Sequence, residues 1–307
     1  MMQLVVSTPL PATNRLRQRC LLDPDVLLNL ETEFRSSKAD VEELSDRFSL
    51  ILNDLRMAGA WKRTKRQRLK QTEEMLCLHV PPQLREDFIL LDLGASDGIT
   101  TVEALRTMKR AFGETSRAYA ADLNLWLLRY RRGPIVEYRA SNGEPIMVRV
   151  GPLGLRLSKS RRGSAEPDYN LMVQLYLRLQ NFRCSMSSDT RISLVNPISR
   201  NEPGLTVIEL DCLKREPSLI NRMSAVRASN ILNLGYFYPD QISQAIGHLH
   251  AYLRDGGCLV ISRNADTDAG ESENGSVWLK ETDRFHWIQN FGSGSEVKEI
   301  VDNWRYP

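Results

Sequence analysis

Residues 88–98 read Phe-Ile-Leu-Leu-Asp-Leu-Gly-Ala-Ser-Asp-Gly, and this stretch decides the fold. Its first half is a short, nearly continuous apolar run, which is typical of a strand buried on both faces of a parallel sheet. Its second half carries Gly94 and Gly98, and apolar residues at helical spacing follow over residues 101–112. A second short strand is expected at residues 118–122. The order of strand, glycine loop, helix and strand predicts a β-α-β unit.

Two carboxylates, Asp92 and Asp122, stand at the carboxyl ends of these two predicted strands. Ligands of α/β sheets bind at that edge, where a carboxylate can accept two hydrogen bonds from a ribose diol. Glycines let the backbone approach a ligand, and the helix N-terminus supplies unpaired N–H groups and a positive dipole. The pattern therefore favours a nucleoside-bearing ligand, and a tight strand-to-helix turn without a ligand is the alternative reading of the loop.

The stretch from Asp92 to Gly98 resembles the first motif of the class I S-adenosylmethionine-dependent methyltransferases, an acidic residue followed by a glycine-rich loop. Ser96 stands where the middle glycine of that motif is commonest, and Asp122 matches the carboxylate that holds the ribose hydroxyls. The resemblance implies S-adenosylmethionine as cofactor. The contacts that it implies in this part of the chain are Asp92, Gly94, Ala95, Ser96, Gly98, Asp122 and Leu123.

Three later segments extend the resemblance along the chain. Residues 207–212 resemble the third strand of the family and its acidic residue beside the adenine, which implies contacts from Asp211 and Cys212. Residues 225–233 resemble the fourth strand, with Asn230 as a further cofactor contact, and the run Arg-x-x-Asn-x-Leu is similar to the chemotaxis-receptor methyltransferases. Residues 253–260 resemble the turn before the fifth strand.

The substrate side is marked less clearly. Arg227, Tyr236 and Tyr238 fall near the end of the fourth strand, where an acceptor sits in this fold, so we expect them to line a substrate pocket. Methyl transfer is an in-line displacement, so alignment supplies most of the rate and a base is needed only for a protonated acceptor. The fourth strand begins Met223-Ser224, where the family usually has an acidic residue, and no catalytic residue is assigned.

The expected architecture is α/β: a Rossmann-like, seven-stranded, mostly parallel sheet with helices on both faces. Residues 1–85 are expected to form an N-terminal helical extension, and residues 86–307 the S-adenosylmethionine-binding domain. Because Asp122 and Asp211 are 89 residues apart, more than a crossover needs, we expect an insertion at about residues 130–200. An Asn-Gly turn at residues 142–143 predicts a β-hairpin subdomain there, and a helix is expected near residues 171–179.

Composition excludes several classes of protein. The 307 residues are 42% hydrophobic and 26% charged, which excludes collagen-like and wholly disordered chains. No run of about 18 apolar residues predicts a membrane span, and the first 20 residues do not resemble a secretory signal, so a cytoplasmic location is expected. The five cysteines are an odd number and widely spaced, which predicts reduced thiols and no metal site. A net charge of +3 gives no indication of nucleic acid.

Two rival functions stay open on the sequence alone. A non-catalytic regulatory protein that binds S-adenosylmethionine would use the same site, and the missing acidic residue of the fourth strand suggests it. A nucleotide-dependent oxidoreductase that uses the same glycine loop for a pyrophosphate is disfavoured because the loop lacks the Gly-x-Gly-x-x-Gly spacing. The acceptor, a small molecule or a protein side chain, is not specified, and the N-terminal helices could form a homodimer or cap the site.

Overall fold

The computed structural model describes residues 3–7, 20–35, 40–53, 55–57, 60–157, 190–267 and 270–306. The fold is α/β with two mixed sheets of seven strands, one in each of two units. Unit 1 comprises Met1–Thr64 and Asn124–Pro197, and unit 2 comprises Lys65–Leu123 and Ile198–Pro307. The division differs from the expected boundary near residue 85, because the first 64 residues group with the insertion and residues 65–85 group with the downstream part of the chain.

The sheet of unit 2 has the strand order β12-β6-β5-β13-β14-β15-β16. Its strands are β5 (Ile89–Leu93), β6 (Arg117–Asp122), β12 (Leu205–Glu209), β13 (Met223–Ser229), β14 (Leu253–Thr267), β15 (Gly270–Lys280) and β16 (Phe285–Phe291). The four neighbouring pairs from β12 to β14 are parallel, and β14–β15 and β15–β16 are antiparallel. The β-α-β unit predicted around the glycine loop is therefore present as β5, α4 (Ile99–Phe112) and β6.

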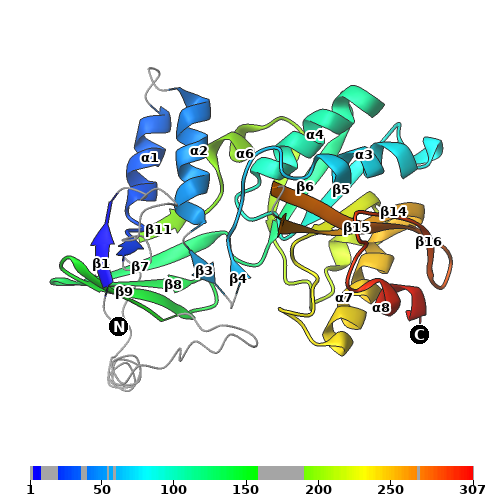
Figure 1. Cartoon of the computed structure of the whole chain (residues 1–307). Coiled ribbons are helices and arrows are strands. Elements are labelled where there is room, and N and C mark those ends of the chain that lie inside the picture. Colours follow the sequence, from blue (N-terminus) through cyan, green and yellow to red (C-terminus); the bar gives the residue numbers. More distant parts are fainter. Residues whose placement is uncertain are drawn as a thin grey trace. The chain divides into compact units, whose positions relative to one another are not determined.

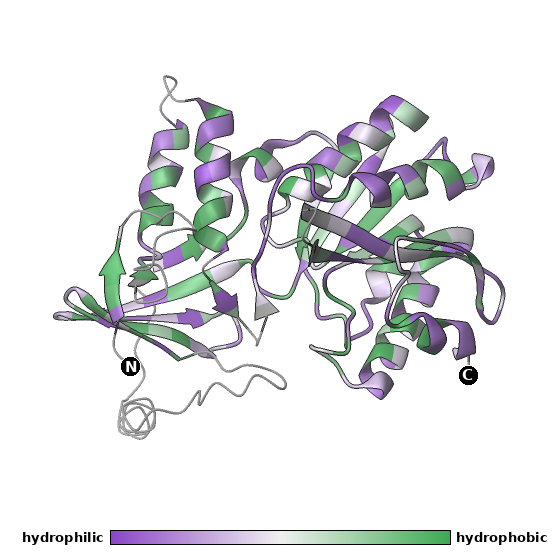
Figure 2. Cartoon of the chain, in the orientation of Figure 1, coloured by the Kyte–Doolittle hydropathy of each residue, from purple (hydrophilic) through white to green (hydrophobic). Residues whose placement is uncertain are grey.

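Helices cover both faces of this sheet, and alternate residues of β5 divide between them. Leu90 packs in a core with side chains of α4 and α3 (Lys70–His79), whereas Leu91 packs in a core with α7 (Pro239–Tyr252) and α8 (Lys298–Asn303). Figure 1 shows the two pairs of helices on opposite sides of the strands. Burial on both faces explains why β5 is apolar except for Asp92 (Figure 2). Among the described residues, no helix is long and apolar enough to cross a membrane.

Unit 1 contains the second sheet, with the strand order β11-β7-β8-β9-β10-β1-β2. Its strands are β1 (Gln3–Val6), β2 (Cys20–Leu22), β7 (Trp126–Arg132), β8 (Ile135–Ala140), β9 (Pro145–Val150), β10 (Leu153–Arg156) and β11 (Thr190–Ser193). Only β1–β2 is a parallel pair. Helices α1 (Val26–Arg35) and α2 (Val41–Leu52) lie side by side (Figure 1), and Leu30 and Phe48 share one core with strand residues such as Tyr138.

The expectation of a purely helical N-terminus was wrong, since this part of the chain contributes β1 and β2 and a small hairpin of β3 (Arg56–Met57) and β4 (Ala60–Trp61). The hairpin around the Asn-Gly turn forms, with Gly143 at φ +84°, as part of the largely antiparallel sheet of unit 1, and its expected role as an inserted subdomain stays a prediction. Pairing between segments about 150 residues apart leaves no local periodicity to read. The helix expected near residues 171–179 lies outside the described residues.

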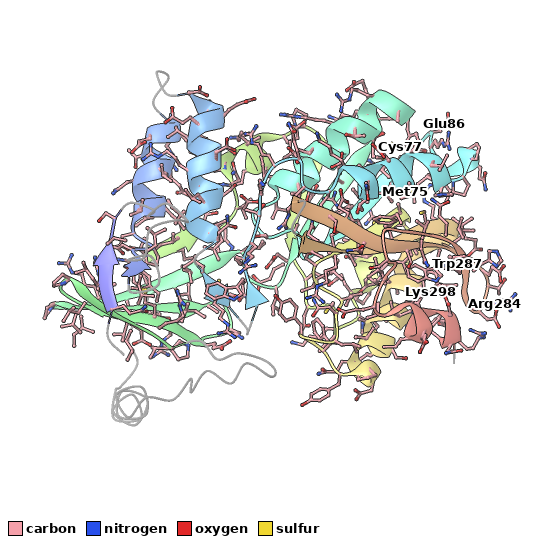
Figure 3. The ribbon with its side chains drawn as sticks, viewed as in Figure 1. Met75, Cys77, Glu86, Arg284, Trp287 and Lys298 are labelled. Atoms are coloured by element: carbon pink, nitrogen blue, oxygen red, sulfur yellow. The ribbon has the colours of Figure 1, made fainter. Side chains whose placement is uncertain are left out.

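The C-terminus of unit 2 is fastened by an aromatic cluster around His250 of α7. The centroid of its ring lies 4.8 Å from that of Trp304 and 5.2 Å from that of Phe285. Nε2 lies 2.9 Å from the carbonyl oxygen of Glu281, so this nitrogen carries the proton, and Nδ1 is buried without a hydrogen-bond partner. Burial lowers the pKa of His250 below its ordinary value of 6.5. Beside it on the surface, the Lys298 ammonium lies 4.7 Å from the centroid of the Trp287 ring (Figure 3).

We expect this histidine to make the stability of the protein depend on pH. The folded state binds the proton of His250 less readily than the unfolded state does. The contribution of the neutral imidazole to the free energy of unfolding is therefore fully present above the pKa of the unfolded state, and it is lost as the pH falls below that pKa. Between about pH 7 and pH 5 the free energy of unfolding, measured in urea, should fall less steeply for His250→Gln than for the wild type. His286→Gln, which removes an exposed imidazole 3.6 Å from Glu281, is the comparison variant for a histidine on the surface. Equal slopes in all three proteins would contradict the assignment.

Candidate functional site

The strand order of unit 2 creates one place where chain connections diverge. From β5 the chain continues outward to β6 and then β12, whereas β13 pairs with β5 on its other side. The carboxyl ends of β5 and β13 therefore border a topological switch point, which is where open α/β sheets bind ligands. The loop that contains Gly94 and Gly98 follows β5, and Asn230 follows β13.

The loop after β5 has an unusual backbone. Gly94, Ser96 and Gly98 have φ angles of +75°, +59° and +84°. The N–H groups of Gly94 and Ala95 both donate to the carbonyl oxygen of Ala121 in β6, at 2.8 and 3.0 Å. The loop thus returns to the neighbouring strand before α4 begins, and the positive φ of Ser96 is a conformation that glycine adopts at lower cost.

Asp122 fastens this loop through its side chain. Its Oδ2 accepts a hydrogen bond from the backbone N–H of Ser96 at 2.9 Å. On the next strand end, the N–H of Leu210 donates to the carbonyl oxygen of Asp122 at 3.0 Å, and Asp211 follows directly. Asp211 is half-buried, and its Oδ1 accepts from the N–H of Leu213 at 3.0 Å. The structure therefore places Asp122 and Asp211 at adjacent strand ends beside the loop.

The half-buried residues Leu123 and Cys212 follow these two carboxylates. Nδ1 of His248 lies 3.0 Å from the carbonyl oxygen of Cys212, so the imidazole N–H donates and α7 holds this turn. Leu123 and Cys212 can offer an apolar surface at the strand ends, which suits the flat face of a base better than a charged group.

Asn230 is held by a residue that the sequence did not single out. Its φ is +62°, and its Nδ2 donates to Oδ1 of Asn264 at 2.8 Å, while the N–H of Asn264 donates to Oδ1 of Asn230 at 2.8 Å. Asn264 lies in β14 and also donates to the carbonyl oxygen of Arg68 at 2.8 Å. The side chain of Asn230 thus fixes the loop after β13, and its predicted role as a cofactor contact stays a prediction.

The structure places Asp92 and Arg227 inside the sheet. Asp92 is 2% exposed and Arg227 is 0% exposed, and they are directly opposite each other on β5 and β13. Nε and Nη2 of Arg227 donate to the two carboxylate oxygens at 2.8 and 2.5 Å, and Thr101 donates to Oδ2. Arg227 does not line a pocket, contrary to our expectation. β13 spans Met223–Ser229, so Arg227 lies within the strand and not beyond its end.

The two tyrosines after β13 differ in exposure. Tyr236 is half-buried against the core under α7, and its N–H donates to Oδ1 of Asn233 at 3.1 Å. Tyr238 is 53% exposed and stands at the N-terminus of α7. Both follow the switch point, so the expectation that they face an acceptor is consistent with their place in the chain and untested by any contact.

The two glycines of the loop are required by close packing within the chain. A Cβ added at Gly94 would lie 2.8 Å from Cβ of Ile231, and one added at Gly98 would lie 2.9 Å from Cβ of Ser199. Ser199 belongs to α6 (Pro197–Asn201). The approach of these neighbours therefore explains the glycines without a ligand, whereas the Asp122 clamp on Ser96 is not explained by packing.

Comparison with known proteins gives a structural likeness only. No family model and no curated protein sequence matches the chain. The solved structures that it resembles include several methyltransferases and the [4+2]-cyclase SpnF. The Burkholderia thailandensis 1,6-didemethyltoxoflavin-N1-methyltransferase, with bound 1,6-didemethyltoxoflavin and S-adenosylhomocysteine, is 13% identical, with 76% of this chain and 65% of that chain covered and a TM-score of 0.34.

Two further structures are the CMeT domain of the citrinin polyketide synthase and geranyl diphosphate methyltransferase in complex with S-adenosylmethionine. The first is 13% identical, with 80% of this chain and 47% of that chain covered and a TM-score of 0.34. The second is 11% identical, with 64% of this chain and 49% of that chain covered and a TM-score of 0.30. This chain therefore spans less than two thirds of the length of each of the three structures.

The loop geometry predicts that Ser96 is under backbone strain. A non-glycine residue at this φ costs about 1 kcal/mol or more, and the buried Oγ of Ser96 has no hydrogen-bond partner. Ser96→Gly and Ser96→Ala both remove the hydroxyl, so the difference between them isolates the backbone. We expect Ser96→Gly to be about 1 kcal/mol more stable than Ser96→Ala in chemical denaturation. Equal stability of the two variants would show that the loop is unstrained.

Proposed function

We propose that the chain is an S-adenosylmethionine-dependent methyltransferase whose cofactor binds to unit 2 at the switch point between β5 and β13. The observation that carries the proposal is the clamp of the Asp122 carboxylate on the Ser96 N–H. It holds the glycine loop against the end of β6 and puts a carboxylate beside the switch point. A ribose diol is the group that a carboxylate in this position recognises in nucleoside-binding sheets.

The residues around the switch point fit the parts of this cofactor. Asp122 would accept hydrogen bonds from the ribose, and Asp211, Leu123 and Cys212 would border the adenine. The loop over residues 94–98 would lie along the amino-acid part, where its backbone can approach a ligand closely. Asp92 is excluded from direct contact with the cofactor, because both of its carboxylate oxygens already accept hydrogen bonds from Arg227 and Thr101.

The bound cofactor would supply an electrophilic methyl group on a sulfonium, and the protein would supply alignment. Displacement at a methyl carbon needs the acceptor atom in line with the leaving sulfur, and alignment of this kind can contribute about 7–11 kcal/mol to lowering a barrier. Tyr236 and Tyr238 follow β13 at the switch point and are the side chains that we propose to border the acceptor. No described side chain is assigned as a base.

Calorimetric titration with S-adenosylmethionine, S-adenosylhomocysteine and NAD tests the proposal directly. We expect the two sulfur compounds to bind and NAD not to bind. Asp122→Asn keeps an oxygen for the Ser96 N–H but removes the charge, and it should weaken binding of both sulfur compounds by roughly 10- to 100-fold. Glu209→Gln is the matched control and should bind as the wild type does. Glu209 is exposed and lies opposite Asp122 on the neighbouring strand β12.

Each result has a definite meaning for the cofactor site. Wild-type affinity in Asp122→Asn would remove the ribose-binding role of this residue. Binding of NAD without the sulfur compounds would favour the oxidoreductase. Binding of the sulfur compounds without any methyl transfer to a panel of small-molecule and peptide acceptors would favour the regulatory protein.

A further inference from the structure

A third charged residue reaches the buried pair of Asp92 and Arg227. Glu73 is in α3 and is 9% exposed, and its Oε1 lies 3.7 Å from Nη1 of Arg227. Nη1 has no hydrogen-bond partner, while Nε and Nη2 of the same guanidinium are bound to Asp92. The guanidinium thus lies between one carboxylate of β5, which it contacts closely, and one carboxylate of α3, which it approaches from the opposite side.

The two carboxylates, when both are ionised, carry two negative charges against the single positive charge of Arg227. Two further carboxylates face Glu73, from Glu103 of α4 and Glu273 of β15, and the thiol of Cys77 lies one turn further along α3. The hydroxyl of Thr107 in α4 donates to Oε2 of Glu73 at 2.9 Å. Burial raises the pKa of Glu73 above its ordinary value of 4.5, and Arg227 opposes this rise.

The first turn of α3, which carries Glu73, is held by Glu273 of β15. The N–H groups of Gln71 and Thr72, in the first turn of α3, donate to the carboxylate of Glu273 at 2.9 and 3.0 Å. The hydroxyl of Thr72 donates to the same carboxylate at 2.8 Å. β15 thus fixes the backbone at this end of α3, and Thr107 holds the carboxylate of Glu73 from α4.

Solvent reaches Glu73 through a groove of about 730 Å³ between α3 and α4. Cys77, at the edge of this groove, marks its position in Figure 3. The residues that line it are Gln67, Lys70, Glu73, Glu74, Cys77, Leu78, Glu103, Arg106, Thr107 and Arg110. Protons can therefore exchange with Glu73 without entering the sheet.

We propose that Glu73 is a positioning residue whose ionisation state sets how firmly Arg227 holds Asp92, and through it the loop over residues 94–98. When Glu73 is ionised, the guanidinium is held from both sides and Asp92 is fixed two residues before Gly94. When Glu73 takes up a proton, Nη1 loses its ionic partner and Asp92 alone holds the guanidinium. The consequence for cofactor affinity rests on the proposed function, whereas the consequence for the loop does not.

The sign of the pH dependence follows from these two states. The loop is firm at high pH and loosens as the pH falls through the pKa of Glu73. Burial raises this pKa above the ordinary value for a glutamate. Affinity for S-adenosylmethionine should therefore fall on acidification, by roughly 2- to 30-fold, the range that residues coupled to a site through contacts usually produce. Burial also raises the pKa of Glu103, which is unchanged in every variant, so only the difference between variants isolates Glu73.

The test compares three variants by calorimetric titration with S-adenosylmethionine and by hydrogen–deuterium exchange of residues 92–98, each from pH 8 to pH 5. Glu73→Gln keeps an acceptor for Thr107 and removes the charge, so it should bind weakly at pH 8. Its residues 92–98 should be poorly protected at pH 8, relative to the intrinsic exchange rate at each pH, with little further change in protection on acidification. Glu73→Asp restores the charge and should restore part of the pH dependence. Glu74→Gln, an exposed neighbour in the same groove, should behave as the wild type.

The two readouts separate the possible failures. Identical pH profiles of affinity and of exchange in the wild type and Glu73→Gln would overturn the positioning role. If S-adenosylmethionine does not bind at any pH, the proposed function fails, and exchange of residues 92–98 still decides whether Glu73 controls the loop. A circular dichroism spectrum and a melting temperature for each variant exclude misfolding as the cause of a difference.

Discussion

The ion pair of Asp92 and Arg227 is the interaction on which the rest of unit 2 depends. Two opposite charges lie fully inside a sheet, in register on β5 and β13, and their attraction must offset the loss of water from both. The fork of the guanidinium matches the two carboxylate oxygens, and Thr101 satisfies a remaining lone pair. Removal of either partner would leave a bare charge in the core, at a cost of about 3–5 kcal/mol. The pair joins the two strands that border the switch point.

The part of the fold that could be predicted from sequence is the part built from contacts near in the chain. The apolar run of β5, the helical spacing of α4 and the carboxylate at the end of β6 fall within about 35 residues, and each has its own periodicity. The site residues Asp122 and Asp211 were placed correctly at strand ends for the same reason. Arg227 was misplaced because a lone arginine in an apolar strand is normally exposed, and nothing local indicates that Asp92 lies opposite.

The second sheet could not be predicted, for a different physical reason. β1 and β2 are short strands that pair with each other, and β1 pairs on its other side with β10, which begins at Leu153, so their stability comes from a surface formed much later in the chain. Asn264 of β14 and Glu73 of α3 likewise contact residues that are far away in the chain, Asn230 and Arg227. Neither belongs to a motif, since an asparagine in a strand or a glutamate in a helix is an ordinary residue until its neighbour is known. The predicted helices α1 and α2 were recognised, but the sheet under them was not.

The antiparallel ribbon at the end of β14 and β15 has a consequence for the order in which this protein is made. Glu273 holds the first turn of α3, 201 residues earlier in the chain, and Asn264 holds the loop of Asn230. The glycine loop is therefore complete in sequence at residue 98 and fastened at Asp122, but the contacts that hold α3 and the loop of Asn230 wait until residue 273 has been translated. At ordinary ribosomal speeds of about 5–20 residues per second, those 175 residues take on the order of ten to thirty-five seconds. During that time the apolar strand β5 has no finished sheet to enter, so the nascent chain requires protection from aggregation for longer than a domain folded from local contacts.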